Sequence, residues 1–354
     1  MPLRVAVVQW TPKPDEVAQA ISEELHHLNY EPTFFRFDQK IPADQDAIFT
    51  YAPWGRVQQF THQLQRIPAA QRPAWAHWNF ESPPDIRLPK RLSLTLGQFR
   101  SAVDRLNDVE SDRLSALQQH KLVQSFNHRL AKFRYVGDYW YARQQEALSV
   151  YAEISQVYAD FYNALGLKTI YAPWGVMRGN YADLGLERDI DVLWIGTRRT
   201  RYRSRNLDRI RSELAEHGVE IYVVDGVERK PVFGEARTEL INRAKITLSL
   251  LPTWYDAALV YRFPLVAANK TLVVSDNSLA HNPLYINHRH YAAAPVDKLA
   301  ETILYYLAHD QEREAIAENG YKLVTEELKL GRGVAVIMEA VEQSLSKSRS
   351  EINP

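Results

Sequence analysis

The sequence contains no cysteine, no long apolar run and no surplus of either charge. The lack of cysteine excludes disulfides, thiolate metal sites, iron–sulfur clusters and a cysteine nucleophile, and it fits a reducing compartment. No run approaches the ~18 apolar residues of a membrane-spanning helix, and the first apolar run is too short for a secretion signal. Lys plus Arg and Asp plus Glu both number 43, so no net field attracts nucleic acid or an anionic membrane. We therefore expect a soluble, cytoplasmic protein without a nucleic-acid partner.

The length of 354 residues predicts two domains, because single hydrophobic cores stop growing near about 250–300 residues. Strands alternate with helices in both halves, which is typical of parallel sheets covered by helices on both faces. In the first half we expect strands at 3–9, 33–37, 47–50, 74–78, 133–136 and 169–171, and helices at 15–28, 57–64, 97–130 and 143–165. In the second half we expect strands at 191–196, 219–224, 246–251 and 271–275, and helices at 206–217, 235–244 and 257–268 and from about 296, 312 and 334. The predicted divisions are an N-terminal domain at 1–175, a C-terminal domain at 176–330, and a helix and tail at 331–354.

One short string occurs twice, because YAPWG stands at 51–55 and again at 171–175. Each copy follows an apolar strand, so its glycine (Gly55 or Gly175) is interpreted as a turn residue. The tryptophan of each copy is then expected near the carboxyl end of a strand. Two similar packing solutions and two turns placed at a ligand site both remain open.

A run of arginines follows the predicted strand at 191–196. Its members are Arg198, Arg199, Arg201, Arg203, Arg205, Arg209 and Arg211. Ligands of open α/β sheets bind beyond the carboxyl ends of the strands, and the first five arginines surround the start of a predicted helix. Because helix N-termini repel cations and attract anions, this pattern favours a phosphate or pyrophosphate site. A solvated basic face and a nucleic-acid site are the alternatives.

Two further features bear on ligands of the second half. Arg262 lies in a predicted helix, where a guanidinium could clamp a diphosphate with two parallel N–H bonds. A structural ion pair is the alternative for this residue. His281, His288 and His290 have a spacing that matches no standard zinc pattern, so we predict no metal site.

Three segments of the second half resemble the donor-binding half of GT-B glycosyltransferases: GEARTELINRAKITLSLL, YRFPLVAANKTLVVSD and VDKLAETILYYLAHDQEREAIAENGYKLV. The resemblance covers about residues 190–330 and is closest to spore-maturation-protein-like and related family-1-type bacterial transferases. In the first half, AWAHWNFESPP and FRYVGDYW look like two cleft-facing segments of that family. The resemblance implies an α/β protein of two Rossmann-like domains facing across a cleft, with the ligand between them. It also implies metal-independent transfer of a sugar from a nucleotide-diphosphate-sugar donor to an unidentified acceptor.

The resemblance assigns donor-site roles by position. Gly196 and Thr197 would approach the donor phosphates, and Arg203, Arg205 and Arg262 would neutralise them. The residues that would line the nucleotide or sugar are Asn269, Lys270, Ser275 and Asp276. No cofactor is implied beyond the donor itself, a UDP- or GDP-sugar.

The sequence departs from the family at the glutamate that commonly holds the ribose. Here the nearby positions are Leu259 and Leu265, and the only acid close by in the sequence is Asp256. Two alternatives to a transferase therefore remain: a non-catalytic nucleotide-sugar-binding or scaffold protein, and a GT-B-shaped sugar-nucleotide epimerase.

The acceptor side depends on the segment HWNFESPP, which follows a predicted strand. An inverting transferase needs a base for the acceptor's proton, and Glu81 or His77 could supply it, with Asp138 as a further candidate. Ordinary structural roles are the alternative for each, such as a helix cap or an ion pair for Glu81. A retaining enzyme would need none of them as a base.

Overall fold

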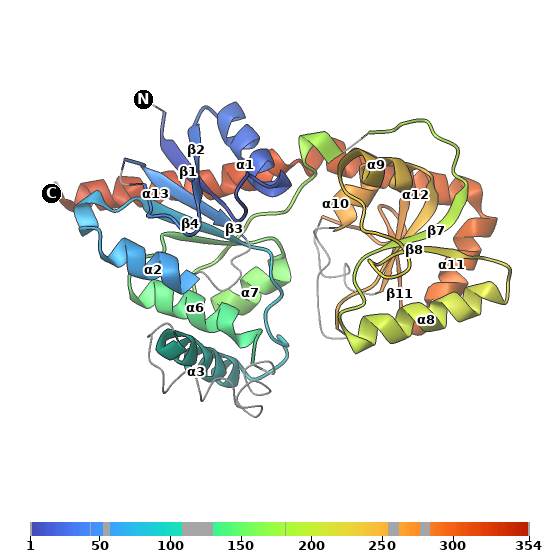
Figure 1. The fold of residues 1–354 in the computed structure, drawn as a ribbon, viewed down its shortest axis with the longest axis horizontal. Coiled ribbons are helices and arrows are strands. Elements are labelled where there is room, and N and C mark those ends of the chain that lie inside the picture. The colour runs from blue at the N-terminus through green and yellow to red at the C-terminus, as the bar shows by residue number, and fades with distance from the viewer. Residues whose placement is uncertain are drawn as a thin grey trace. The chain divides into compact units, whose positions relative to one another are not determined.

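The computed structural model describes residues 2–42, 44–51, 57–107, 130–180, 182–253, 262–276 and 284–352. The chain forms two compact units (Figure 1). The first comprises Met1–Ile154, Tyr158–Ala172 and Gly333–Pro354, and the second comprises Ser155–Val157 and Pro173–Arg332. The segment from Gly333, expected as a separate helix and tail, is thus part of the first unit.

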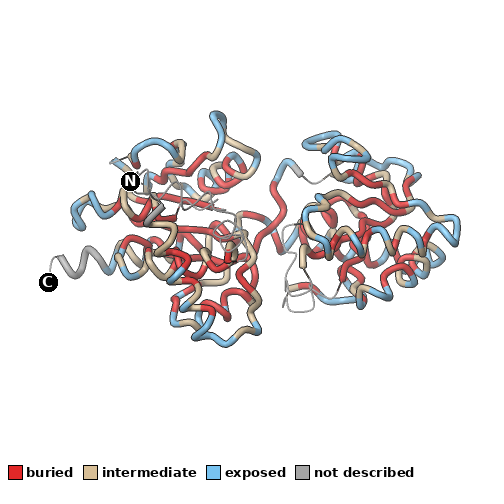
Figure 2. The backbone as a smooth tube through the Cα atoms, turned by 60° about the horizontal axis from the view of Figure 1, so that its bottom comes forward, coloured by how far each residue is buried: buried red, intermediate tan, exposed pale blue. Residues whose placement is uncertain are grey.

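The first unit is built on a parallel sheet with the strand order β2-β1-β3-β4-β5-β6. Its strands are β1 (Arg4–Gln9), β2 (Glu31–Arg36), β3 (Ala47–Tyr51), β4 (Ala74–Asn79), β5 (Val150–Glu153) and β6 (Ile170–Tyr171). Its helices are α1 (Glu16–His27), α2 (Val57–Gln65), α3 (Lys90–Asn107), α6 (Phe133–Gln144), α7 (Gln156–Ala164) and α13 (Leu330–Ile352). Every residue of β3, β4 and β5 is buried, as expected of strands covered on both faces (Figure 2).

The C-terminal helix α13 is fixed to the first unit by its side chains. Ile337, Met338 and Val341 are fully buried. The hydroxyl of Tyr30 donates a hydrogen bond of 2.9 Å to Glu342. The helix therefore completes the core of a unit whose strands lie at the other end of the sequence.

Two of the predicted elements in the first unit are wrong. Residues 133–136 are the first turn of α6 rather than a strand, and the helix expected at 143–165 contains β5 before α7. Helix α6 packs so closely on α3 that a Cβ added to Gly137 would lie 1.8 Å from the carbonyl oxygen of Gly97. This tertiary contact overrides the strand preference of an aromatic segment. Strand β5 is fixed by pairing with β4, which no local pattern reports.

The second unit has a parallel sheet with the order β11-β10-β9-β7-β8. Its strands are β7 (Ile190–Ile195), β8 (Ile221–Val224), β9 (Ala244–Ser249), β10 (Leu272–Asp276) and β11 (Ala292–Ala294). Its helices are α8 (Arg201–Ala215), α9 (Gly234–Asn242), α10 (Arg262–Ala267), α11 (Leu299–Ala308) and α12 (Asp310–Lys322). Two parallel α/β domains confirm the predicted fold class, although α8 begins earlier than expected and only part of the helix predicted at 257–268 is described.

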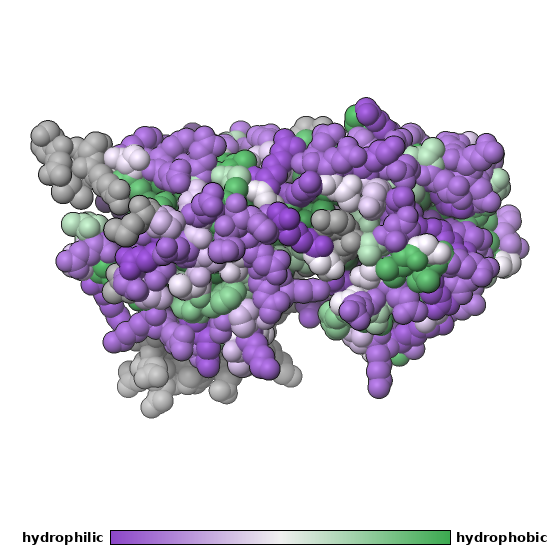
Figure 3. All heavy atoms as spheres, turned by 90° about the horizontal axis from the view of Figure 1, so that it is seen from above, coloured by the Kyte–Doolittle hydropathy of each residue, from purple (hydrophilic) through white to green (hydrophobic). Residues whose placement is uncertain are grey.

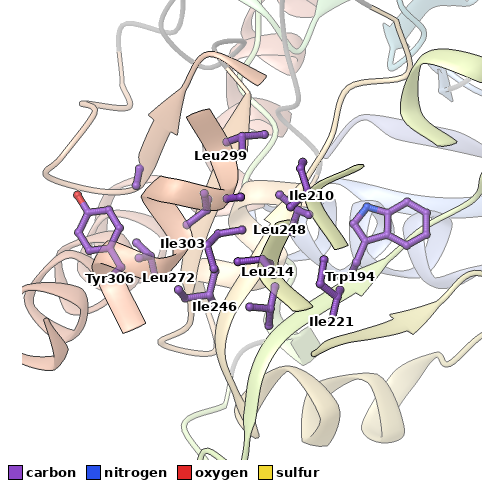
Figure 4. Packing of buried hydrophobic residues seen from close by; sticks show 14 of the residues in the cluster. Trp194, Ile210, Leu214, Ile221, Ile246, Leu248, Leu272, Leu299, Ile303 and Tyr306 are labelled. Atoms are coloured by element: carbon purple, nitrogen blue, oxygen red, sulfur yellow. The ribbon is translucent and has the colours of Figure 1, made fainter. Parts of the chain in front are cut away.

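The core of the second unit shows why α8 lies on its sheet. Leu207, Ile210 and Leu214 recur at helical spacing and are fully buried. Figure 4 shows Ile210 and Leu214 beside Leu248 of β9. This packing directs the first turn of α8 toward the carboxyl edge of the sheet, because the helix returns antiparallel to the strand before it.

Each sheet has one point where the chain reverses its direction of winding. In the second unit β7 lies between β8 and β9, so the loops after β7 and β9 diverge at the carboxyl edge. In the first unit β1 lies between β2 and β3 in the same way, and the Trp10 indole donates a 3.0 Å hydrogen bond to the Tyr51 carbonyl there. Ligands of open α/β sheets bind at such points.

The surface seen in Figure 3 is mainly hydrophilic, with small apolar areas between polar ones. Among the described residues, no helix combines the length and apolar character needed to cross a membrane.

Candidate functional site

Arg203 joins the two loops that diverge at the reversal point of the second sheet. Thr200 caps α8 by accepting a 3.3 Å hydrogen bond from the backbone N–H of Arg203. The Arg203 side chain is buried, and it donates to the carbonyl of Thr197 after β7 (3.3 Å) and to that of Leu250 after β9 (3.1 Å). The residue therefore fixes the two loops between which a ligand of this sheet is expected.

Arg262, at the start of α10, brings a second guanidinium to this place. Its Nη1 is buried and has no hydrogen-bond partner among the described residues. Gly196 gives it room, because a Cβ there would lie 3.1 Å from Arg262 Nη2. Burial, and next the charge of Arg203, lower the pKa of Arg262 to about 10. A buried cation beside a second cation is unfavourable unless an anion binds to both.

The end of β10 contributes an acid to the same edge of the sheet. Asp276 is buried and accepts a 3.2 Å hydrogen bond from the backbone N–H of Leu251. Burial, and next the charge of Asp276, raise the pKa of the Tyr202 hydroxyl in the first turn of α8. The structure thus places Ser275 and Asp276 near the arginine site, and it adds Tyr202, which the sequence analysis missed although it directly precedes Arg203.

The other arginines of the run have different surroundings. Arg198 forms ion pairs with Asp225 (2.8 Å), Glu228 (3.0 Å) and Asp208, so it stabilises the loop after β8. Arg205 is exposed on α8. The arginines of this run therefore have different roles. Arg198 stabilises a loop, whereas Arg203 is the member of the run that lies at the predicted anion site.

Asn269 and Lys270 do not lie with the other donor candidates. Both precede β10, whereas Asp276 ends it, and a strand of this length separates its two ends by roughly 15 Å. Asn269 accepts a 2.7 Å hydrogen bond from the side chain of Asn242. Lys270 forms ion pairs with Asp183 (3.0 Å) and Glu318 (3.2 Å). These two residues stabilise the opposite edge of the sheet, so their assignment to the donor site is corrected.

His77 in the first unit lies inside the sheet rather than at its edge. The side chain is 1% exposed, and its Nδ1 lies 2.7 Å from the Thr50 hydroxyl oxygen. Burial lowers the pKa of His77 to about 3. A buried imidazole that resists protonation so strongly does not fit the role of a base at neutral pH.

Asp138 is also buried, on the face of α6 that packs against α2 and α3. It accepts a 2.6 Å hydrogen bond from Gln58 Nε2, which also donates to the hydroxyl of Ser101 (2.9 Å). Burial raises the pKa of Asp138 to about 6. These contacts indicate a structural polar cluster rather than a group that reaches a substrate.

Glu81 is the one catalytic candidate that lies beyond the end of its strand. It follows β4 and is half-buried, with its backbone N–H 3.2 Å from Asn79 Oδ1. Burial, and next the charge of Glu81, raise the pKa of Tyr135 in α6, and the two side chains share a hydrogen bond. Beside Asn79 lies a buried acid, Glu153, which the sequence analysis placed inside a helix and therefore missed.

Comparisons with known structures define the class of fold. The sucrose-phosphate synthase of Thermosynechococcus elongatus is similar, with 12% identity, a TM-score of 0.57 and coverage of 98% of this chain and 100% of that one. HepE of Anabaena with UDP-glucose is 10% identical and has a TM-score of 0.55, with coverage of 98% of this chain and 100% of that one. The T4 phage enzyme BGT with UDP-glucose is 10% identical and has a TM-score of 0.53, with coverage of 97% of this chain and 99% of that one. The chain has the GT-B fold of these proteins.

The match to a known protein family lies mainly in the second unit. Residues 199–338 match the family model described as "Glycosyl transferase-like". The match includes both Arg203 and Arg262, and it confirms the resemblance to glycosyltransferases. No curated protein sequence matches the chain.

Proposed function

We propose that the protein is a glycosyltransferase that moves a sugar from a UDP- or GDP-sugar to an unidentified acceptor. The observation that carries the proposal is the buried Nη1 of Arg262, which lies beside Arg203 and has no hydrogen-bond partner among the described residues. Both lie at the reversal point of the sheet, in the part of the chain that is glycosyl transferase-like. HepE and BGT were crystallised with UDP-glucose, which favours a uridine donor.

The chemistry follows from the charges that the reaction creates. The bond between the sugar's anomeric carbon and the diphosphate oxygen breaks, and its electron pair leaves with the nucleoside diphosphate. Arg203 and Arg262 stabilise this growing negative charge in a site that is already organised to receive it. The acceptor oxygen bonds to the anomeric carbon, and its proton goes to the carboxylate of Glu81 if the configuration is inverted.

A donor screen tests the binding part of the proposal. The melting temperature is measured with UDP, GDP, ADP, CMP and dTDP, since a ligand at about 100 times its Kd adds about 2.7 kcal/mol of stability. A rise with one diphosphate identifies the donor class. No rise with any of them would contradict a nucleotide-sugar site.

Assays with the matching nucleotide sugar then distinguish a transferase from an epimerase and from a binding or scaffold protein. Release of the diphosphate that increases with an added acceptor, or slow hydrolysis without one, supports a transferase. Conversion of the sugar without any acceptor would indicate an epimerase. Tight binding without turnover would indicate a binding or scaffold protein.

A further inference from the structure

Two buried polar residues meet at the carboxyl ends of neighbouring strands in the first unit. Asn79 ends β4 and Glu153 ends β5, and the two are register partners in the sheet. Both are 0% exposed. Asn79 Nδ2 donates a hydrogen bond of 2.5 Å to Glu153 Oε1. A polar pair this deeply buried is costly unless its hydrogen bonds are kept together.

The same Asn79 amide also holds both backbone groups of Glu81. Its Nδ2 donates to the Glu81 carbonyl (2.9 Å), and its Oδ1 accepts from the Glu81 N–H (3.2 Å). An asparagine side chain that bonds to the backbone two residues later closes a tight turn. Its position therefore decides where the chain after β4 turns, and Glu153 is the buried anchor of that position.

We propose that Glu153 is a positioning residue that, through Asn79, fixes the turn carrying Glu81 and so the direction of the Glu81 carboxylate. This inference rests on the proposed function in one respect, the role of Glu81 as the base for the acceptor. Glu153 itself does not touch a substrate, because its side chain is wholly buried.

The raised pKa of Glu153 is consistent with this role. Burial raises the pKa of Glu153 well above its usual range, and the hydrogen bond from Asn79 offsets only part of this effect. Burial therefore favours the uncharged form of Glu153. An uncharged anchor can hold Asn79 without adding a second negative charge close to Glu81. The Glu81 carboxylate has a separate contact with Tyr135, so it is oriented from two sides.

Kinetics of single and double variants test the coupling. Glu153→Gln keeps a hydrogen-bond acceptor for Asn79, so it retains most of the turnover. Glu153→Leu removes the acceptor, and kcat falls about 10- to 100-fold while the KM for the donor stays the same, because misplacement by about 1 Å can cost 10²-fold. Adding Glu153→Leu to Glu81→Gln slows the enzyme no further, since both changes remove the same contribution. Additive losses in the double variant, or full turnover in Glu153→Leu, would overturn the proposal.

Asn79→Ala is a second way to break the same link if Glu153→Leu does not fold, and it should give the same kinetic pattern. A readout without turnover is the backbone amide resonance of Glu81 in an NMR spectrum. It shifts in Glu153→Leu and Asn79→Ala but stays in place in Glu153→Gln. If it moves in none of these, Glu153 does not position the turn, whatever the protein's activity is. If it moves as expected but Glu81→Gln turns over normally, the base assignment fails, and with it the catalytic purpose of the anchor.

Discussion

The guanidinium groups of Arg203 and Arg262 lie close enough at the carboxyl edge of the second sheet for Arg203 to lower the pKa of Arg262. Arg203 donates to two backbone carbonyls, whereas Nη1 of Arg262 has no partner among the described residues. Like charges placed together in this way store free energy that an anion releases on binding.

Replacing Arg262 should therefore weaken ligand binding without lowering the stability of the ligand-free protein. In Arg262→Met, nucleotide diphosphate binding weakens by roughly 1.5–3 kcal/mol, the range for hydrogen bonds to charged groups. The melting temperature of the ligand-free protein does not fall, because the change removes a guanidinium whose buried Nη1 has no partner among the described residues. Calorimetric titration and thermal unfolding measure the two effects. The matched control is Arg201→Ala, which changes an exposed arginine in the same region. Equal affinity in Arg262→Met and the wild type would refute the assignment.

Turnover should survive an excess of EDTA. Among the described residues, no group of three or more His, Asp or Glu side chains could hold a metal ion. In the proposed mechanism, Arg203 and Arg262 neutralise the charge of the leaving diphosphate instead. The test compares initial rates with EDTA and with added magnesium or manganese. A strict requirement for either metal would argue against arginines as the sole source of this neutralisation.

Glu81→Gln should lower turnover about 10²- to 10⁴-fold, the usual contribution of a general base. Donor affinity should stay nearly constant, because Arg203 and Arg262, the arginines proposed to bind the donor, belong to the other unit. Steady-state rates and a donor titration measure this, with Glu31→Gln at the exposed start of β2 as the control. Turnover within a few-fold of the wild type would show that Glu81 is not the base. A sharp fall in melting temperature would instead indicate a structural role.

The stability of the protein should depend on pH through His77. Its pKa is about 3 in the folded chain and near 6.5 when unfolded, so the unfolded state gains a proton first as pH falls. The stabilisation from neutral His77 is thus present above pH 6.5 and is lost between 6.5 and 3, at about 1.4 kcal/mol per pH unit. Urea unfolding at pH 7 and pH 5 should show a smaller loss in His77→Asn than in the wild type. Equal losses would contradict the neutral, buried state.

Asp138 should change the stability of the protein with pH in the direction opposite to His77. Burial raises its pKa from 3.8 to about 6, so the folded state holds a proton that the unfolded state releases. This stabilisation is present below about pH 4 and is lost as pH rises through 6. Asp138→Asn, which stays uncharged, should therefore lose less stability between pH 5 and pH 7.5 than the wild type does. An unchanged pH slope in urea unfolding would rule out the raised pKa.

Gly175 is expected to tolerate no side chain. A Cβ there would lie 2.2 Å from the carbonyl carbon of Lys329, where the N–H of Val176 donates to the carbonyl of Leu328 (2.9 Å). Gly175→Ala should cost about 1–3 kcal/mol, as overpacking does. Gly179→Ala is the control, because nothing lies within 4 Å of a Cβ at that position. Equal denaturation midpoints for the two variants would contradict this close approach.

The sequence alone predicted the alternation of strands and helices, because buried parallel strands leave continuous apolar runs that are readable without partners. It also predicted an anion site after β7, because arginines at the start of a helix conflict with the helix dipole. The resemblance to GT-B transferases predicted a donor-site role for Arg262, and the fold and the family match confirm the resemblance itself.

Only the tertiary structure decided which of these residues meet. Lys270 and Asp276 are close in sequence, yet a strand separates them, because five extended residues span a whole sheet. Asn79 and Glu153 are far apart in sequence, yet they share a hydrogen bond, because β4 and β5 pair across a long connection. Local patterns report the preferences of neighbouring residues, whereas a site depends on strand order and register, which arise from packing over the whole unit.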